Sequence, residues 1–197
     1  MMLATATRWA TVALVVSLSA VAQTKAPKTA GRVPRFEDYL VTDIFHGSPA
    51  APRLATPTER LFRTRIRDGV TKGLGVMREG KEQPGPNFAG HYIVIEWGCG
   101  SPCGMMAIVD ALTGKVYSPP ISPEGFMLPF LPIKVPGDPD AFVPWVAEVA
   151  FRLNSGLMIV KANPDPSKER SNYTHYFLWK HNRWSLLRRV PLTDTTP

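Results

Sequence analysis

The chain has 197 residues, of which 44% are hydrophobic and 20% are charged, and its formal net charge is +7. This length fits one domain with a sizeable core, and no internal repeat indicates an array of smaller units. The basic excess is moderate and suits plain solubility, acidic envelope surfaces or anionic glycans, while no phosphate loop, dinucleotide fingerprint or nucleic-acid motif accompanies it. We therefore expect one globular domain and no nucleic-acid partner.

The N-terminal segment has the pattern of a secretory signal peptide. Arg8 precedes an apolar run from Trp9 to Val21, which ends in the small residues Ala20-Val21-Ala22. The run is shorter than the roughly 20 residues that a membrane-spanning helix needs, and no cysteine follows it to carry a lipid. We expect residues 1–22 to be removed, with export to the periplasm or the medium after cleavage near Ala22 and no transmembrane segment in the mature chain.

Residues 23–34 are rich in Lys, Pro, Thr and Ala without an apolar period, which predicts a flexible tail before a single globular domain at residues 35–197. Loss of Arg8 with the signal leaves 22 basic and 16 acidic residues, so the mature formal charge is 22 − 16 = +6. The only two cysteines, Cys99 and Cys103, would meet an oxidising compartment. We expect them to form a disulfide.

A helix is predicted from Pro57 to about Thr71. Thr56 is a suitable N-cap, Pro57 suits the first helical position, and Glu59 completes a capping box. Four apolar side chains share one side of this helix and are expected to pack on a sheet: Leu61, Phe62, Ile66 and Val70. Three arginines lie on another side and are interpreted as a solvated face, with anion binding as the alternative: Arg60, Arg63 and Arg67.

The centre of the chain predicts a β-hairpin closed by a disulfide. The runs His91 to Trp97 and Met105 to Asp110 have the composition of strands, and the glycine-rich segment Gly98 to Gly104 joins them. Alternation places Tyr92, Val94 and Glu96 on one face and the intervening residues on the other. A carboxylate on a covered strand needs a partner, so we expect Glu96 to pair with basic residues of the helix or to lie at an edge, with a catalytic acid as the alternative.

Antiparallel hairpins are predicted after this centre as well. Turn residues join Asp110 to the short strand 115–117, the strand 149–153 to 157–161, and the strand 173–179 to 183–190. The segment Ser118 to Pro144 has eight prolines and many apolar residues. It is either a strap over the core or an apolar surface for a partner, and we favour the strap. The expected fold class is α+β, with a mainly antiparallel sheet of about six to eight strands and one packed helix.

Several short motifs occur together in the central third of the chain. They are Asn87-Phe88-Ala89-Gly90-His91-Tyr92, Trp97-Gly98-Cys99-Gly100 with Cys103, Ile108-Val109-Asp110, and Thr113-Gly114. The combination resembles an uncharacterised family of exported bacterial proteins. The resemblance implies export and a similar layout of the helix and last hairpins, and it implies no particular activity.

Enzyme chemistry at the cysteines has little support in the sequence. The run Cys99-Gly100-Ser101-Pro102-Cys103 resembles the Cys-Gly-Ser-Cys run of papain-like proteases, but Pro102 interrupts it and a strand precedes it. A redox pair usually has two residues between its cysteines and lies at a helix start, whereas three residues separate these. A metal site would need paired histidines that the sequence lacks. We expect no metal and no cofactor.

These observations predict a non-catalytic exported envelope protein, acting as a binding or structural module through its stapled loop. The partner would be an envelope component of unknown identity, and the sequence does not set the oligomeric state. The alternative is an enzyme that acts on envelope peptide or glycan with Cys99 or Glu96. The expected binding residues surround the loop or lie at its base: His91, Tyr92, Glu96, Trp97, Gly100 and Ser101.

Overall fold

The structure is a computed structural model that describes residues 31–100, 103–122, 125–135, 138–163 and 172–192, with the backbone alone described at residues 130–135 and 138–146. The expected signal peptide, most of the expected tail and the residues Ser101 and Pro102 lie outside the described residues. None of the helices in the described part of the chain is long and apolar enough to cross a membrane.

Antiparallel strands make up most of the described fold. The strands are β1 Met77–Arg78, β2 Lys81–Glu82, β3 Tyr92–Gly100, β4 Cys103–Asp110, β5 Val116–Tyr117, β6 Phe130–Val135, β7 Asp138–Val146, β8 Glu148–Phe151, β9 Leu157–Ala162, β10 Tyr173–Lys180 and β11 Arg183–Pro191. They form a three-stranded sheet in the order β3-β4-β5, a four-stranded sheet in the order β11-β10-β9-β8, and the pairs β1-β2 and β6-β7. The predicted class, mainly antiparallel with few helices, is confirmed; the strands are divided among separate sheets.

The helical part begins as the sequence predicts and then breaks once. Thr56 Oγ1 accepts a hydrogen bond from the Glu59 backbone at 3.1 Å, and the Glu59 carboxylate accepts one from the Thr56 backbone at 3.2 Å. Helix α1 (Pro57–Leu61) and helix α2 (Arg63–Lys72) are separated by one residue, Phe62. A short 3-10 helix, η1 (Phe36–Tyr39), precedes both. The capping-box prediction is confirmed, whereas the single continuous helix is not observed.

The break changes which apolar side chains face the sheet. Ile66 and Val70 are buried as expected, and Phe62 is half-buried with its ring centroid 5.6 Å from that of Trp97. Leu61 is 72% exposed, so the prediction that it packs on the sheet is wrong. The backbone turn at Phe62 directs that ring inward, and its neighbour Leu61 is left in solvent.

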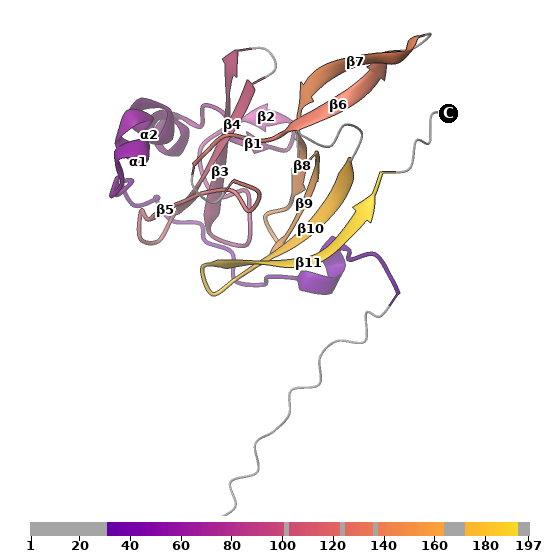
Figure 1. The fold of residues 1–197 in the computed structure, drawn as a ribbon. Coiled ribbons are helices and arrows are strands. Elements are labelled where there is room, and N and C mark those ends of the chain that lie inside the picture. Colours follow the sequence, from indigo (N-terminus) through magenta and orange to yellow (C-terminus); the bar gives the residue numbers. More distant parts are fainter. Residues whose placement is uncertain (1–30, 101–102, 123–124, 136–137, 164–171, 193–197) are drawn as a thin grey trace, which may run out of the picture. The chain divides into compact units, whose positions relative to one another are not determined.

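The sheet of β3, β4 and β5 lies between α2 and the four-stranded sheet (Figure 1), and a hydrophobic core fills each side. One core joins side chains of β3 and β4 to side chains of β9 and β10, and the other joins the opposite face of β3 and β4 to α2. Tyr92 and Val94 belong to the first core, whereas Ile93 and Ile95 belong to the second. The alternation predicted for β3 is therefore confirmed, and the helix and the four-stranded sheet cover opposite faces of the hairpin.

The residues before β3 form a tight turn that anchors the strand. The backbone groups of Phe88 and Tyr92 exchange two hydrogen bonds, and the buried Asn87 amide bonds both backbone groups of Val94. Gly90 has φ of 84°, and a Cβ there would lie 2.4 Å from the Asp43 carbonyl oxygen. Phe88 is fully buried. The motif from Asn87 to Tyr92 thus has the structural roles expected of its residue types.

The later hairpins follow their predicted turns closely. Strands β8 and β9 pair antiparallel around Asn154-Ser155-Gly156, and β10 pairs with β11 around His181 and Asn182, both at positive φ. Phe126 and Leu128 are buried beside the start of β4, which supports the strap interpretation for this part of the proline-rich segment. Later residues of the segment belong to β6 and β7, which pair with each other and project beyond the two larger sheets (Figure 1).

Candidate functional site

The end of the β3-β4 hairpin carries the disulfide. Cys99 and Cys103 are joined, with their Cα atoms 5.1 Å apart, so the predicted disulfide is present in the structure. Gly98 pairs with Gly104 and Gly100 pairs with Cys103, and the register shift between Gly98 and Gly100 leaves Cys99 outside the ladder. Gly98, Cys99 and Gly100 are exposed. We refer to residues 96–100 and 103–105 as the disulfide end.

A cavity of about 410 Å³ lies between α2 and the disulfide end. Its lining residues are Thr64, Arg65, Asp68, Leu74, Gly75, Glu82, Ile95, Glu96, Trp97 and Gly98. The ring of Trp97 packs against the rings of Phe62 and Phe126, whose centroids lie 5.6 and 6.0 Å from its own. This helix-side cavity therefore combines an aromatic surface with charged groups of both signs.

A close approach of two backbones fixes the wall of the helix-side cavity. Gly75 accepts a hydrogen bond from the Glu96 backbone N–H at 2.9 Å and donates one to the Glu82 carboxylate, also at 2.9 Å. Gly75 has φ of 75°, and a Cβ there would lie 2.1 Å from the Glu96 carbonyl oxygen. Only glycine fits this position, so the loop after α2 can cover the edge of β3.

A second cavity of about 410 Å³ lies on the opposite face of the disulfide end. Its lining residues are Glu96, Trp97, Gly98, Cys103, Gly104, Met105, Leu128, Ala147 and Val149. Alternation puts the Glu96 side chain on the face of Tyr92 and Val94, which is the face that Leu128 and Ala147 cover. We refer to this space as the Glu96 cavity.

The carboxyl group of Glu96 has no hydrogen bond or ion pair with any described residue, although its side chain is only partly exposed. Burial raises the pKa of Glu96 from 4.5 to about 7, because the charged form loses its water without gaining a partner. The expected pairing with basic residues of the helix is not observed. The helix packs against Ile93 and Ile95, the side chains of the other face of β3. Arg65 of the helix shares the helix-side cavity with Glu96, but it forms no ion pair with this carboxyl.

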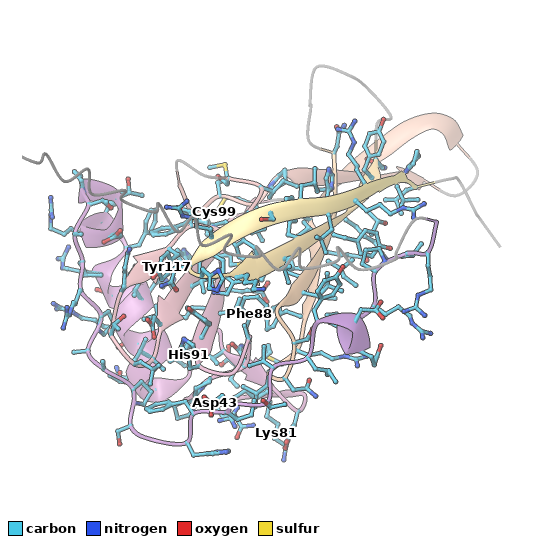
Figure 2. All side chains as sticks on the ribbon, turned by 90° about the horizontal axis from the view of Figure 1, so that it is seen from below. Asp43, Lys81, Phe88, His91, Cys99 and Tyr117 are labelled. Carbon is cyan, nitrogen blue, oxygen red and sulfur yellow. A yellow bond between two sulfur atoms is a disulfide. The ribbon has the colours of Figure 1, made fainter. Side chains whose placement is uncertain are left out.

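The structure does not bring His91 and Tyr92 to the loop. They lie at the start of β3, about 25 Å of strand away from Gly100 by the usual rise per residue. His91 Nε2 is 3.9 Å from the Asp110 carboxylate, and the Tyr92 hydroxyl donates a hydrogen bond to Asn182. Figure 2 shows His91 and Cys99 at well-separated places in the fold. Of the six predicted binding residues, Glu96, Trp97 and Gly100 share the disulfide end, and Ser101 lies outside the described residues.

Several residues of the site could not be found from the local sequence. Gly75, Arg65, Leu128 and Val149 come from separate segments, and no motif connects them to the loop. The positive φ of Gly75 has a signal in the sequence, since glycine clusters predict turns, but the pattern does not tell which strand the turn will meet. The sequence therefore predicts the loop at the centre of the site, whereas the residues that line the cavities around it are brought there by tertiary packing.

Metal and thiol chemistry have no support in the described site. Among the described residues, no group of three or more His, Cys, Asp or Glu side chains is placed to hold a metal ion. Both cysteines are in the disulfide, so neither offers a thiolate while the bond is intact. The arrangement instead offers two cavities, the Trp97 ring and the Glu96 carboxyl group, which has no partner among the described residues.

The fold and the site together define an antiparallel protein whose disulfide-closed hairpin is covered by a helix on one face and a sheet on the other. Comparison with known proteins finds no matching family model, no matching curated protein and no matching solved structure. The resemblance to a family of exported proteins therefore stays a prediction, and the geometry of the disulfide end is the feature that bears on function.

Proposed function

We propose that the chain is a non-catalytic exported envelope protein that binds its ligand at the disulfide end. The observation that carries this proposal is the position of Glu96, Trp97 and Gly98, which line both cavities beneath the disulfide. A short disulfide loop stabilises a fold little but holds backbone groups in one arrangement, and such preorganisation lowers the ordering cost of binding. The disulfide is also compatible with the oxidising compartment to which the predicted signal peptide would send the chain.

The test is a pull-down from envelope extract with three forms of the protein. The wild type is compared with the Cys99→Ser, Cys103→Ser double variant, and His91→Ala is the matched control at the other end of β3. All three are first shown to be folded by circular dichroism. We expect a specific envelope component that the wild type and His91→Ala retain and the double variant loses. Equal capture by all three forms would contradict a binding role for the disulfide end.

A second candidate is an enzyme that acts on envelope peptide or glycan through Glu96. The observation that favours it is a carboxyl group without a partner among the described residues, whose pKa of about 7 is near the pH at which a general acid or base works best. The test is turnover of an envelope peptide or glycan by the wild type and by Glu96→Gln. If the wild type is active and Glu96→Gln is not, the enzyme interpretation replaces the binding interpretation. The disulfide variant should keep such activity, because Cys99 is not the reacting group in this alternative.

A further inference from the structure

We propose that the Glu96 cavity binds a small ligand with an apolar body and one protonated amine, the ammonium group lying against the Glu96 carboxylate. This inference rests on the proposed binding function and names the ligand class for one of its two cavities. It is carried by three observations: the cavity's size, the apolar side chains along one of its walls, and the carboxyl group that no described residue satisfies.

The size of the cavity and its apolar side suit the body of such a ligand. Its volume of about 410 Å³ falls within the range of small-molecule sites. Leu128 and Ala147 are buried, and Val149 is half-buried beside them, so this side of the cavity is hydrocarbon. The hydrophobic effect then favours a ligand that covers these side chains with apolar surface.

The only ionisable side chain among the described lining residues of this cavity is that of Glu96. Glu148, the neighbour of both Ala147 and Val149, is exposed and forms an ion pair with Lys161 at 2.7 Å. On the other face of β3, Arg65 and Asp68 of α2 and Glu82 line the helix-side cavity. Glu96 borders that cavity too, but Asp68 is paired with Lys72, Glu82 accepts the Gly75 N–H, and no described charge forms an ion pair with the Glu96 carboxyl.

An ionised carboxylate among apolar groups is unfavourable unless a partner replaces its lost hydration. No described residue supplies such a partner, so we expect a ligand to supply it. An ammonium group provides both an opposite charge and N–H donors, whereas an anionic ligand would be repelled and a neutral alcohol would provide only a weaker hydrogen bond. The site should therefore select an amine over its alcohol and carboxylate analogues.

Binding of the amine should be coupled to the titration of Glu96. The free carboxyl is partly protonated near neutral pH, and the bound carboxylate must be ionised, so binding releases a proton from this group. Between pH 8 and pH 5.5 the ionised fraction of a carboxyl with a pKa of about 7 falls roughly 30-fold. The affinity for the amine should fall by about the same factor, while binding of the alcohol should change little.

The experiment uses three probes with one apolar body: cyclohexylmethylamine, cyclohexylmethanol and cyclohexylacetate. Their dissociation constants for the full mature chain are measured by NMR titration at pH 8 and pH 5.5. We expect the amine to bind at least tenfold more tightly than the other two at pH 8. Glu96→Gln should abolish this preference, and Glu148→Gln, a matched change on an exposed glutamate, should keep it.

Three results would overturn the inference: equal binding of amine and alcohol, an amine preference that survives Glu96→Gln, or no saturable binding of the amine. Each can be told apart from failure of the proposed function by the pull-down. If the disulfide variant loses its envelope partner but the amine shows no preference, only the ligand class is wrong. If the amine binds as expected but all forms capture the same proteins, the cavity is a ligand site and the disulfide end is not the partner surface.

Discussion

The two ends of strand β3 differ in how completely their polar groups are satisfied. At the start of the strand, the buried Asn87 amide bonds the backbone of Val94, and the Asp110 carboxylate accepts hydrogen bonds from the Leu112 backbone and the Thr113 hydroxyl. At the disulfide end, Glu96 has no partner among the described residues, and two cavities adjoin it. Groups satisfied within the fold stabilise it, whereas a group left unsatisfied is available to a ligand.

The motif with the most recognisable residues lies at the satisfied end. Its asparagine, glycine and aromatic residues are explained by the turn they build, with no ligand required. His91 and Tyr92 belong to this end, which is why the structure separates them from the loop. The distinction between the two ends can be tested by substitutions, of which the first should have the largest effect on stability.

Phe88→Ala should destabilise the fold by about 4 kcal/mol, because it removes a fully buried ring from the core beneath the start of β3. The ring contacts Phe151 and Trp184 of other strands, with centroids 6.1 and 5.8 Å away, so its loss leaves a cavity that several elements share. Chemical denaturation monitored by circular dichroism would measure the change. A loss below about 1 kcal/mol would show that this end is not the anchor of the strand.

Glu96→Gln should stabilise the fold at high pH, the opposite of the effect expected for Phe88→Ala. The folded state raises the pKa of Glu96 from 4.5 to about 7, so it binds this proton more tightly than the unfolded chain does. Stability from this group is therefore greatest below about pH 4.5 and falls as the pH rises through about 7. At pH 8 the shift corresponds to at most about 3 kcal/mol, reduced by the partial exposure of the side chain.

The measurement for this variant is the free energy of unfolding at pH 4 and at pH 8. We expect Glu96→Gln to be more stable than the wild type at pH 8 and nearly equal to it at pH 4. Glu148→Gln is the control, because its loss of a surface ion pair should change stability by less than about 1 kcal/mol. A Glu96→Gln variant that is less stable than the wild type at pH 8 would mean that the carboxylate has a partner after all.

The Cys99→Ser, Cys103→Ser variant should lose about 2 kcal/mol or less, because the disulfide closes a very short loop. The effect should be local. Hydrogen exchange should increase at the backbone amides of Trp97 and Met105 and stay unchanged at Tyr92 and Val94, where the Asn87 turn holds the strand. Uniform loss of protection along β3 would show that the two ends are not independent.

The parts of the fold that could be predicted are those fixed by local chemistry. The β8-β9 and β10-β11 hairpins follow their turn residues, and the capping box sets the start of α1. The exposure of Leu61 and the missing partner of Glu96 could not be predicted, because they depend on which element covers which face of β3. Strands β6 and β7 contain prolines that argue against a central strand, but two strands paired only with each other tolerate them.

His91→Ala should have the smallest effect on stability, although His91 belongs to the motif with the most recognisable residues. The substitution removes a half-buried ring that packs on Tyr92 and lies 3.9 Å from the Asp110 carboxylate. Asp110 keeps its bonds to Leu112 and Thr113, so no buried charge is left without a partner, and the loss should be about 1 kcal/mol or less. Denaturant titration measures the loss, and Asp110→Asn, which weakens both retained bonds, should cost more. If His91→Ala instead proves as damaging as Phe88→Ala, or if it alone abolishes capture of the envelope partner, the start of β3 is a functional site and the division of the strand into a structural end and a binding end is wrong.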